Sequence, residues 1–217
     1  MPDVERKKLP WRSLFLFAIA LGATFVFLAI ADELREGDLD GIDTHIAIWV
    51  HTRQSTLLDI IMILFTKIGS GPALIAAIAA VSFWSYKRGR NSYILILCAN
   101  AVIAMVVTPI LKAIFARARP TLFEVIKRPD TYSFPSGHSM SAVVIFGSIA
   151  AVIIALRPSA KVPVTIAAGI LMVCIGFSRV YLGAHWPMDV LAGWASGVPF
   201  LIATVHIIHR AKRGEAT

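Results

Sequence analysis

The sequence predicts an all-α, polytopic membrane protein with six transmembrane helices and one interfacial amphipathic helix. Of its 217 residues, 57% are hydrophobic and only 16% are charged, whereas soluble domains carry roughly a quarter charged residues. Six apolar runs approach the roughly 20 residues that a helix needs to cross a bilayer. The lysines and arginines lie mostly in short clusters between these runs. Together, these observations indicate a chain whose surface mainly contacts lipid.

The six apolar runs follow one another along most of the chain. We place them at residues 13–31, 71–86, 92–115, 138–156, 162–181 and 187–208, of which the second is short. The first has the basic flank of a signal peptide. It exceeds a typical signal core, however, and lacks a small-residue cleavage site, so we expect it to remain as a span. Because no internal repeat or low-complexity tract divides the sequence, we expect one domain, residues 1–217.

The stretch between the first two runs is too polar at its start to cross a bilayer. From Thr56 onward, apolar residues recur at the spacing i, i+3, i+4, i+7 and i+8, which gives a helix one apolar face. These residues are Leu57, Ile60, Ile61, Leu64 and Phe65. Thr56 and Asp59 resemble an N-terminal capping pair. Residues 56–67 are therefore predicted to form a helix that lies at the membrane interface.

The basic residues predict the orientation of the chain in the membrane. If the N-terminus is cytoplasmic, twelve of the 21 lysines and arginines fall in short inside segments, as the positive-inside rule requires. The first outside loop instead collects acidic residues between residues 32 and 43. We therefore expect both termini to be cytoplasmic and the interfacial helix to lie in this extracytoplasmic loop.

Composition and motifs also exclude several function classes. The net charge of +8 does not indicate a nucleic-acid partner, because membrane topology already explains the cationic clusters. Cys98 and Cys174 lie within apolar runs, which disfavours a disulfide framework or a cysteine metal site. With no HExxH motif or carboxylate cluster, we expect neither a metal nor another cofactor. Asn100, within the third run, is expected to hydrogen-bond to another helix.

One outside region departs from the general charge distribution. Five cations gather on the face that otherwise avoids positive charge: Lys112, Arg117, Arg119, Lys127 and Arg128. The alternative interpretation is a solvated loop with ordinary surface charges. Lys112, however, lies in the last turn of an apolar span, where a charge is costly and usually indicates a functional site.

The stretch SFPSGHSM, residues 133–140, begins the fourth run at the same outer face. Its PSGH segment places free backbone N–H groups at the positive end of a helix dipole, which favours phosphate and other anions. Taken alone, Ser136 can simply cap the helix. Arg179 ends the fifth run at this face, and with Lys112 and Arg119 it can neutralise a phosphate group.

His185 and Asp189 are predicted to form a pair at the start of the sixth run. Their spacing of four residues stacks two side chains on one helix face. A carboxylate there can hold one imidazole N–H and leave the other ring nitrogen as a nucleophile or base. His138 is then free to protonate a leaving oxygen. Interfacial, snorkelling or capping roles can explain each residue singly, but not the meeting of three cations, two histidines and one aspartate.

Three motifs resemble the signature of the type 2 phosphatidic acid phosphatase family. KAIFARARP (112–120), PSGH (135–138) and SRVYLGAHWPMD (178–189) match its pattern K-x6-R-P, P-S-G-H and S-R-x5-H-x3-D. The resemblance implies metal-independent dephosphorylation through a covalent phosphohistidine, with His185 as the nucleophile, Asp189 orienting it and His138 as the acid. The residues that it implies for holding the phosphoryl group are Lys112, Arg119, Ser136, Gly137 and Arg179. Arg117 lies outside the signature.

The resemblance also implies a substrate class. Bacterial family members of this size act on lipid phosphates such as undecaprenyl pyrophosphate, phosphatidylglycerophosphate and phosphatidic acid. An enzyme of the inner (plasma) membrane with an extracytoplasmic active site is therefore expected. The same signature occurs in soluble vanadium haloperoxidases, but the six spans argue against that branch. A non-catalytic lipid-phosphate carrier is the alternative, although binding alone needs no oriented histidine pair. The sequence leaves the lipid tail and the oligomeric state open.

Overall fold

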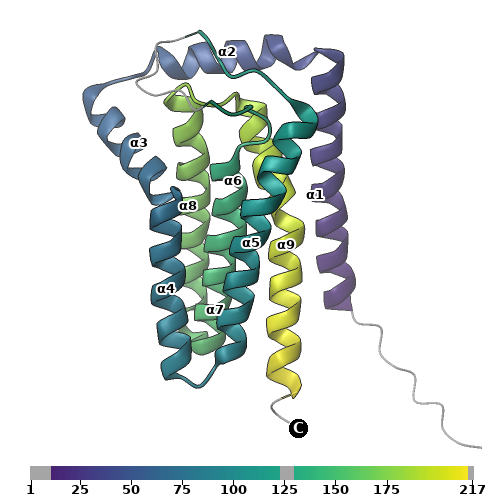
Figure 1. Cartoon of the computed structure of the whole chain (residues 1–217), viewed down its shortest axis with the longest axis vertical. Coiled ribbons are helices and arrows are strands. Elements are labelled where there is room, and N and C mark those ends of the chain that lie inside the picture. The colour runs from purple at the N-terminus through teal and green to yellow at the C-terminus, as the bar shows by residue number, and fades with distance from the viewer. Residues whose placement is uncertain (1–10, 123–129, 215–217) are drawn as a thin grey trace, which may run out of the picture.

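Every regular element of the chain that the structure describes is helical (Figure 1). The computed structural model describes residues 11–122 and 130–214. In chain order the elements are α1 (Trp11–Glu36), α2 (Leu39–His51), α3 (Thr56–Ile68), α4 (Gly71–Lys87), α5 (Asn91–Phe115), α6 (Gly137–Ser141), η1 (Ala142–Phe146), α7 (Gly147–Leu156), η2 (Pro158–Ala160), α8 (Lys161–Tyr181) and α9 (Pro187–Gly214).

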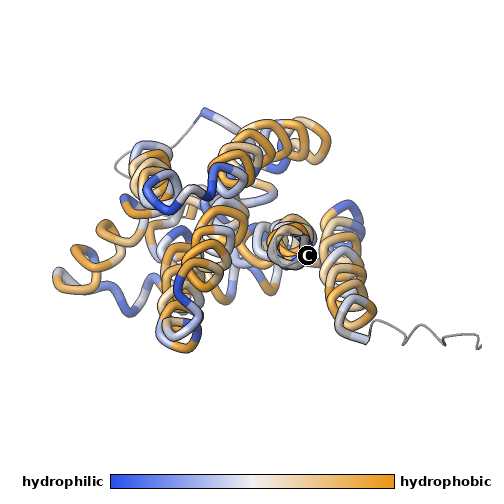
Figure 2. The backbone as a smooth tube through the Cα atoms, turned by 90° about the horizontal axis from the view of Figure 1, so that it is seen from below, coloured by the Kyte–Doolittle hydropathy of each residue, from blue (hydrophilic) through white to orange (hydrophobic). Residues whose placement is uncertain are grey.

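The long helices have the length and hydropathy of membrane spans. Within the described residues, five helical segments pass this test alone, and a sixth is formed if the α3–α4 pair, bent by 57°, counts as one span. Large apolar side chains such as Phe15, Leu95 and Val162 are exposed on these helices, and apolar residues make up most of their length (Figure 2). Such a surface is compatible with lipid and not with water. The predicted class of an all-helical membrane protein is therefore confirmed.

The PSGH helix is the centre of the bundle. In the most apolar part of the continuous stretch α6–η1–α7, Gly137–Leu156, 67% of the residues are buried, whereas the corresponding share in the other four spans is between 11% and 28%. Its neighbours are α4, α5, α8 and α9, while α1 packs against α9. Gly193 lets α9 approach closely, because a Cβ atom there would lie 2.6 Å from the carbonyl oxygen of Ser136. The start of this central helix is thereby surrounded by the ends of several others.

Helix α2 is an element that the sequence interpretation missed. It lies across one end of the bundle, where it packs against α8 and α9, and we call this end the site end (Figure 1). Its buried residues Leu39, Asp43, Ala47 and Val50 recur at helical spacing and face the bundle. The acidic residues around them concealed this pattern, since one of the four inward positions is itself an aspartate.

Helix α3 begins at Thr56, as predicted, but its cap differs from the expected one. Ser55 is the N-cap residue, and its Oγ accepts a hydrogen bond from the Leu58 N–H. Asp59 instead accepts a hydrogen bond of 2.7 Å from the Tyr181 hydroxyl of α8. A long-range contact therefore replaced the local capping pair. The expectation for Asn100 is confirmed, because its Nδ2 donates to Thr204 Oγ1 of α9 at 2.9 Å.

Candidate active site

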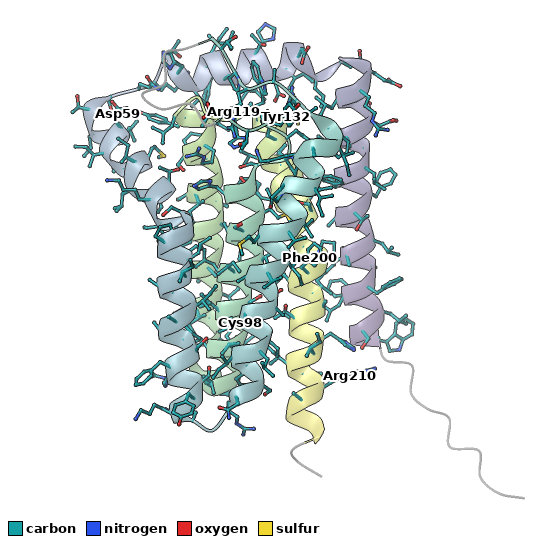
Figure 3. The ribbon with its side chains drawn as sticks, viewed as in Figure 1. Asp59, Cys98, Arg119, Tyr132, Phe200 and Arg210 are labelled. Carbon is teal, nitrogen blue, oxygen red and sulfur yellow. The ribbon has the colours of Figure 1, made fainter. Side chains whose placement is uncertain are left out.

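The three motifs meet at the site end, beneath α2. Lys112 lies in the last turn of α5, and Arg119 lies in the segment that follows it. Arg179 lies in the last turn of α8, His185 in the connection to α9, and Asp189 in the first turn of α9. Figure 3 shows Arg119 and Tyr132 close together under α2, and a guanidinium–carbonyl hydrogen bond of 3.3 Å joins them. Residues from opposite halves of the chain thus share one site.

His185 and Asp189 form a buried pair. The His185 Nδ1 lies 3.2 Å from Asp189 Oδ2, and the two side chains are 3% and 0% exposed. The same oxygen accepts hydrogen bonds from the Ser133 hydroxyl at 2.6 Å and from the Trp186 N–H at 3.0 Å. An Nδ1–H that donates to Asp189 leaves a lone pair on Nε2. That nitrogen lies 3.3 Å from Arg119 Nη1, so it faces the cations.

The guanidinium of Arg119 is fixed by backbone oxygens. Its Nε donates to the Thr131 carbonyl and its Nη1 to the Ala184 carbonyl, both at 2.6 Å. Lys112 Nζ donates to the Tyr132 carbonyl. These contacts fix both cations of the first motif, and they hold Arg119 beside the His185 ring.

Arg179 approaches the site from the opposite side. Its Nη1 donates to the Thr66 hydroxyl of α3, and its buried Nε has no hydrogen-bond partner within the described part of the chain. Arg179, His185, Arg119 and Lys112 all interact electrostatically with His138. The predicted cations and the two histidines therefore lie near one another, and an anion among them would satisfy the charge, although of these residues Lys112, Arg119 and His138 line the cavity described below and Arg179 and His185 do not.

The PSGH turn is both a helix cap and part of this space. Ser136 Oγ accepts hydrogen bonds from the Ser139 N–H at 3.4 Å and from the Ser139 hydroxyl at 2.9 Å. The Ser136 N–H donates to the Asp189 carbonyl at 2.9 Å, which joins the turn to α9. A Cβ atom on Gly137 would lie 2.9 Å from Thr108 Cγ2, so glycine allows α5 to pass close by. The capping role of Ser136 thus coexists with its place at the site.

Two residues at the site were given no role by sequence reasoning. Arg117 lies between the carboxylates of Asp189 and Asp43, and the latter side chain comes from α2. The ion pairs with Asp189 and Asp43 outweigh the effect of burial, which by itself would lower the pKa of Arg117, and that pKa is raised. For Asp43, burial dominates and raises the pKa, although Met188 and Arg117 oppose the change. In the sequence, Arg117 was one of the five cations gathered at this face, and that grouping was the available signal for its place at the site. Nothing in the sequence singled out Asp43.

A cavity of about 1000 Å³ extends from the cations into the bundle. Its polar end includes Lys112, Arg119 and His138. The remainder passes between α4 and α5 and is lined mainly by apolar side chains, among them Leu74, Ile78, Ala101, Met105 and Ile145. The cavity therefore combines a cationic end with an apolar compartment in one continuous space.

The donor set at this site favours an anion over a metal ion. In residues 11–122 and 130–214, the single cluster of His, Cys, Asp or Glu side chains close enough to hold a metal consists of Glu33, Glu36 and Asp38. These acids are exposed, and none of them lines the cavity. Asp189, the carboxylate that pairs with His185, already accepts hydrogen bonds on both oxygens. Three surrounding cations would also repel a metal ion.

Comparison with known proteins gives a consistent set of similarities. A family model described as the PAP2 superfamily matches residues 93–213, which include all three motifs. Over 191 residues the chain is 29% identical to phosphatidylglycerophosphatase B from Bacillus subtilis, covering 86% of this chain and 88% of that protein. It is 30% identical over 179 residues to undecaprenyl-diphosphatase from Sulfolobus acidocaldarius, covering 80% and 82%. The crystal structure of a transmembrane PAP2-type phosphatidylglycerolphosphate phosphatase from Bacillus subtilis matches with a TM-score of 0.72 at 25% identity, over 90% of this chain and 96% of that one.

Proposed function

This chain belongs to the PAP2 superfamily and is an integral-membrane phosphatase, and from this premise we propose that it hydrolyses a lipid phosphate or pyrophosphate through a phosphohistidine on His185. The observation that carries the proposal is that the His185–Asp189 pair lies against Arg119, which itself lines the polar end of an apolar cavity. Such a cavity suits an amphiphile whose charged head reaches the cations while its tail stays among apolar groups.

The first step transfers the phosphoryl group to the enzyme. Lys112, Arg119 and Arg179 hold the phosphoryl oxygens, together with the backbone N–H groups at the start of α6. His185 Nε2 attacks phosphorus, and the bond between phosphorus and the leaving oxygen breaks. His138 donates its proton to that oxygen, which departs with the lipid, or with the lipid monophosphate when the substrate is a pyrophosphate. Asp189 stabilises the positive charge that the His185 ring acquires.

The second step releases inorganic phosphate. His138, now unprotonated, takes a proton from water, and the water oxygen attacks phosphorus. The bond between phosphorus and His185 Nε2 then breaks, which restores the neutral imidazole. The three cations stabilise the charge on the equatorial oxygens in both steps, so no metal ion is needed for this purpose. A panel of phosphatidylglycerophosphate, undecaprenyl pyrophosphate and phosphatidic acid, assayed for phosphate release, tests the proposal and identifies the preferred lipid.

The pH dependence of kcat/KM should reflect a neutral His185. Burial lowers the pKa of His185 to about 4; Asp189 opposes this change, and Arg179 and Arg119 add to it. A lowered pKa keeps the nucleophile unprotonated in acid, so kcat/KM should stay level down to about pH 5, well below the ordinary histidine pKa of about 6.5. The profile is measured with purified protein after correction for the titration of the substrate phosphate. An acid limb near the ordinary histidine value would contradict this expectation.

Narrowing the apolar part of the cavity should impair lipid substrates selectively. Ala101 lines the cavity, whereas the neighbouring Val102 is 54% exposed and faces away from it. Ala101→Phe is expected to raise KM for a lipid phosphate about tenfold or more, because a phenyl ring takes space that the tail needs. It should leave hydrolysis of p-nitrophenyl phosphate nearly unchanged. Val102→Phe is the matched control, and equal effects of both variants would argue against a tail in this cavity.

We also propose that the protein lies in the inner (plasma) membrane with both termini in the cytoplasm and the site end outside. The distribution of lysines and arginines supports this orientation. A cysteine introduced at Thr131 should react in intact cells with a thiol reagent that does not cross the membrane. Labelling only after the membrane is broken would reverse the proposed orientation.

A further inference from the structure

Arg117 is a buried cation outside the family signature, held at the centre of the site. Its side chain is 7% exposed. One end of the guanidinium, Nη1, donates to Asp189 Oδ1 at 3.0 Å. The other end, Nη2, lies 2.8 Å from Asp43 Oδ2. Because arginine presents several donors in a rigid plane, it can fix two carboxylates at once.

Asp43 connects this arginine to α2 and to the start of α9. The side chain is fully buried, and its Oδ1 accepts a hydrogen bond of 2.9 Å from the Met188 N–H. Asp40, one turn earlier, lies 3.4 Å from Arg117 but is 79% exposed, so its contribution is small. Asp43 contacts an arginine and the start of a helix, and it has no part in the proposed chemical steps. Its position calls for a separate explanation.

The contacts of Asp189 supply that explanation. Its Oδ2 faces His185, Ser133 and Trp186, whereas its Oδ1 accepts from Arg117. The hydrogen bond from Arg117 therefore restricts rotation of the Asp189 carboxylate, a rotation that would turn Oδ2 away from the His185 ring. A nucleophile that is misplaced by even about 1 Å can lose a large part of its reactivity.

The second carboxylate, that of Asp43, changes the net charge of the trio formed by Arg117, Asp189 and Asp43. Arg117 paired with Asp189 alone would cancel the negative charge that stabilises the His185 ring when phosphorus bonds to it. With Asp43 included, two carboxylates share one guanidinium, and the trio keeps a net negative charge. We propose that Arg117 and Asp43 are positioning residues, in which Arg117 orients Asp189 toward His185 and Asp43 both anchors Arg117 and offsets its charge. This inference rests on the proposed function.

The two residues should act on the acid limb of kcat/KM in opposite directions. The charged groups that face His185 are Asp189 from α9, Arg119 from the segment after α5 and Arg179 from α8, with His138 from α6 nearby. Arg117→Gln removes a positive charge behind Asp189, which favours the protonated His185 ring and moves the limb to higher pH by about one unit. Asp43→Asn removes negative charge and moves the limb to lower pH, by less than Arg117→Gln raises it, because burial raises the pKa of Asp43 and so reduces its charge in acid. A merely structural role would not produce opposite shifts.

The test measures kcat, KM and the pH profile of phosphate release for both variants in the full-length protein. We expect kcat to fall about 10- to 100-fold, the effect of losing a charged hydrogen bond. KM should change little, because the phosphate-binding cations remain. Arg53→Gln and Asp38→Asn make the same chemical changes at exposed positions at the two ends of α2 and should behave as the unmodified protein does.

The outcomes separate this inference from the function on which it rests. Reduced kcat with opposite shifts of the acid limb supports the positioning role. Activity and profiles like those of the controls, or shifts in one common direction, would overturn it. If Arg117→Gln does not fold, Arg117→Lys takes its place; it should lower kcat without the upward shift, since the charge is kept. Absence of phosphate release from the unmodified protein would refute the proposed function itself.

Discussion

Replacement of His185 by alanine is expected to lower phosphate release from a lipid phosphate by about 10⁴-fold or more. In the proposed mechanism this variant lacks the atom that bonds to phosphorus, and removing a covalent nucleophile eliminates the whole pathway that depends on it. The buried position of the ring, 3.2 Å from Asp189 and facing Arg119, supports this role. Release of inorganic phosphate by the purified protein in detergent micelles measures the effect.

Two controls accompany the His185 variant. His45→Ala makes the same substitution at an exposed position on α2 and should retain activity. EDTA should also leave activity unchanged, because the cations at the site stabilise the phosphoryl charge. Full activity of a purified His185→Ala protein would refute the mechanism. If the unmodified protein binds lipid phosphates without releasing phosphate, a non-catalytic carrier is the better description.

Replacement of His138 by alanine should give a loss that depends on the leaving group. With a lipid phosphate, the departing alkoxide needs a proton, and loss of a general acid costs about 10²- to 10⁴-fold. With p-nitrophenyl phosphate, the departing phenolate is stable without a proton, so the first step should be nearly unaffected. His138 lines the polar end of the cavity beside Lys112 and Arg119, where such a proton transfer can occur.

The ratio of the two rates provides the test for His138. The rate constant for the first step is measured for both substrates by rapid mixing, with the unmodified protein and with His138→Ala. A selective loss for the lipid substrate agrees with the role of an acid. An equal loss for both substrates would show that His138 acts on a step that the leaving group does not influence. A role in binding the phosphate group, without proton transfer, would then explain the position of His138 in the cavity.

The sequence predicted most of the membrane architecture because the bilayer imposes a simple rule on each span. The helices of spans three, four, five and six begin and end close to the predicted apolar runs, since about 20 apolar residues are needed for each crossing, whereas α1 continues past the predicted end of the first run to Glu36. The second span was less clear, because α4 is short and continues into α3 through a bend. A bend of this kind depends on packing around Gly69, where a Cβ atom would lie 2.5 Å from Ile175 of α8. No local pattern predicts such a contact.

The site was predictable to the extent that its residues lie in recognisable motifs. The spacing of His185 and Asp189 anticipated their contact, and the topology anticipated that Lys112, Arg119 and Arg179 would share one end. The residues that support them were not predictable in the same way. Asp43 and Arg117 meet across most of the first half of the chain, as do Thr66 and Arg179 across its middle. Such pairs are set by how the helices pack, and a single sequence does not contain that information.

Detection of the phosphorylated enzyme tests the central claim most directly. His138→Ala protein is mixed rapidly with p-nitrophenyl phosphate and quenched in alkali, in which phosphohistidine survives. The variant should transfer the phosphoryl group readily but hydrolyse the intermediate slowly, because no base remains to activate water. A stoichiometric burst of p-nitrophenol, with the phosphoryl group located on His185 by mass spectrometry, is the predicted result. Steady turnover without a burst, or a phosphoryl group on another residue, would contradict the mechanism.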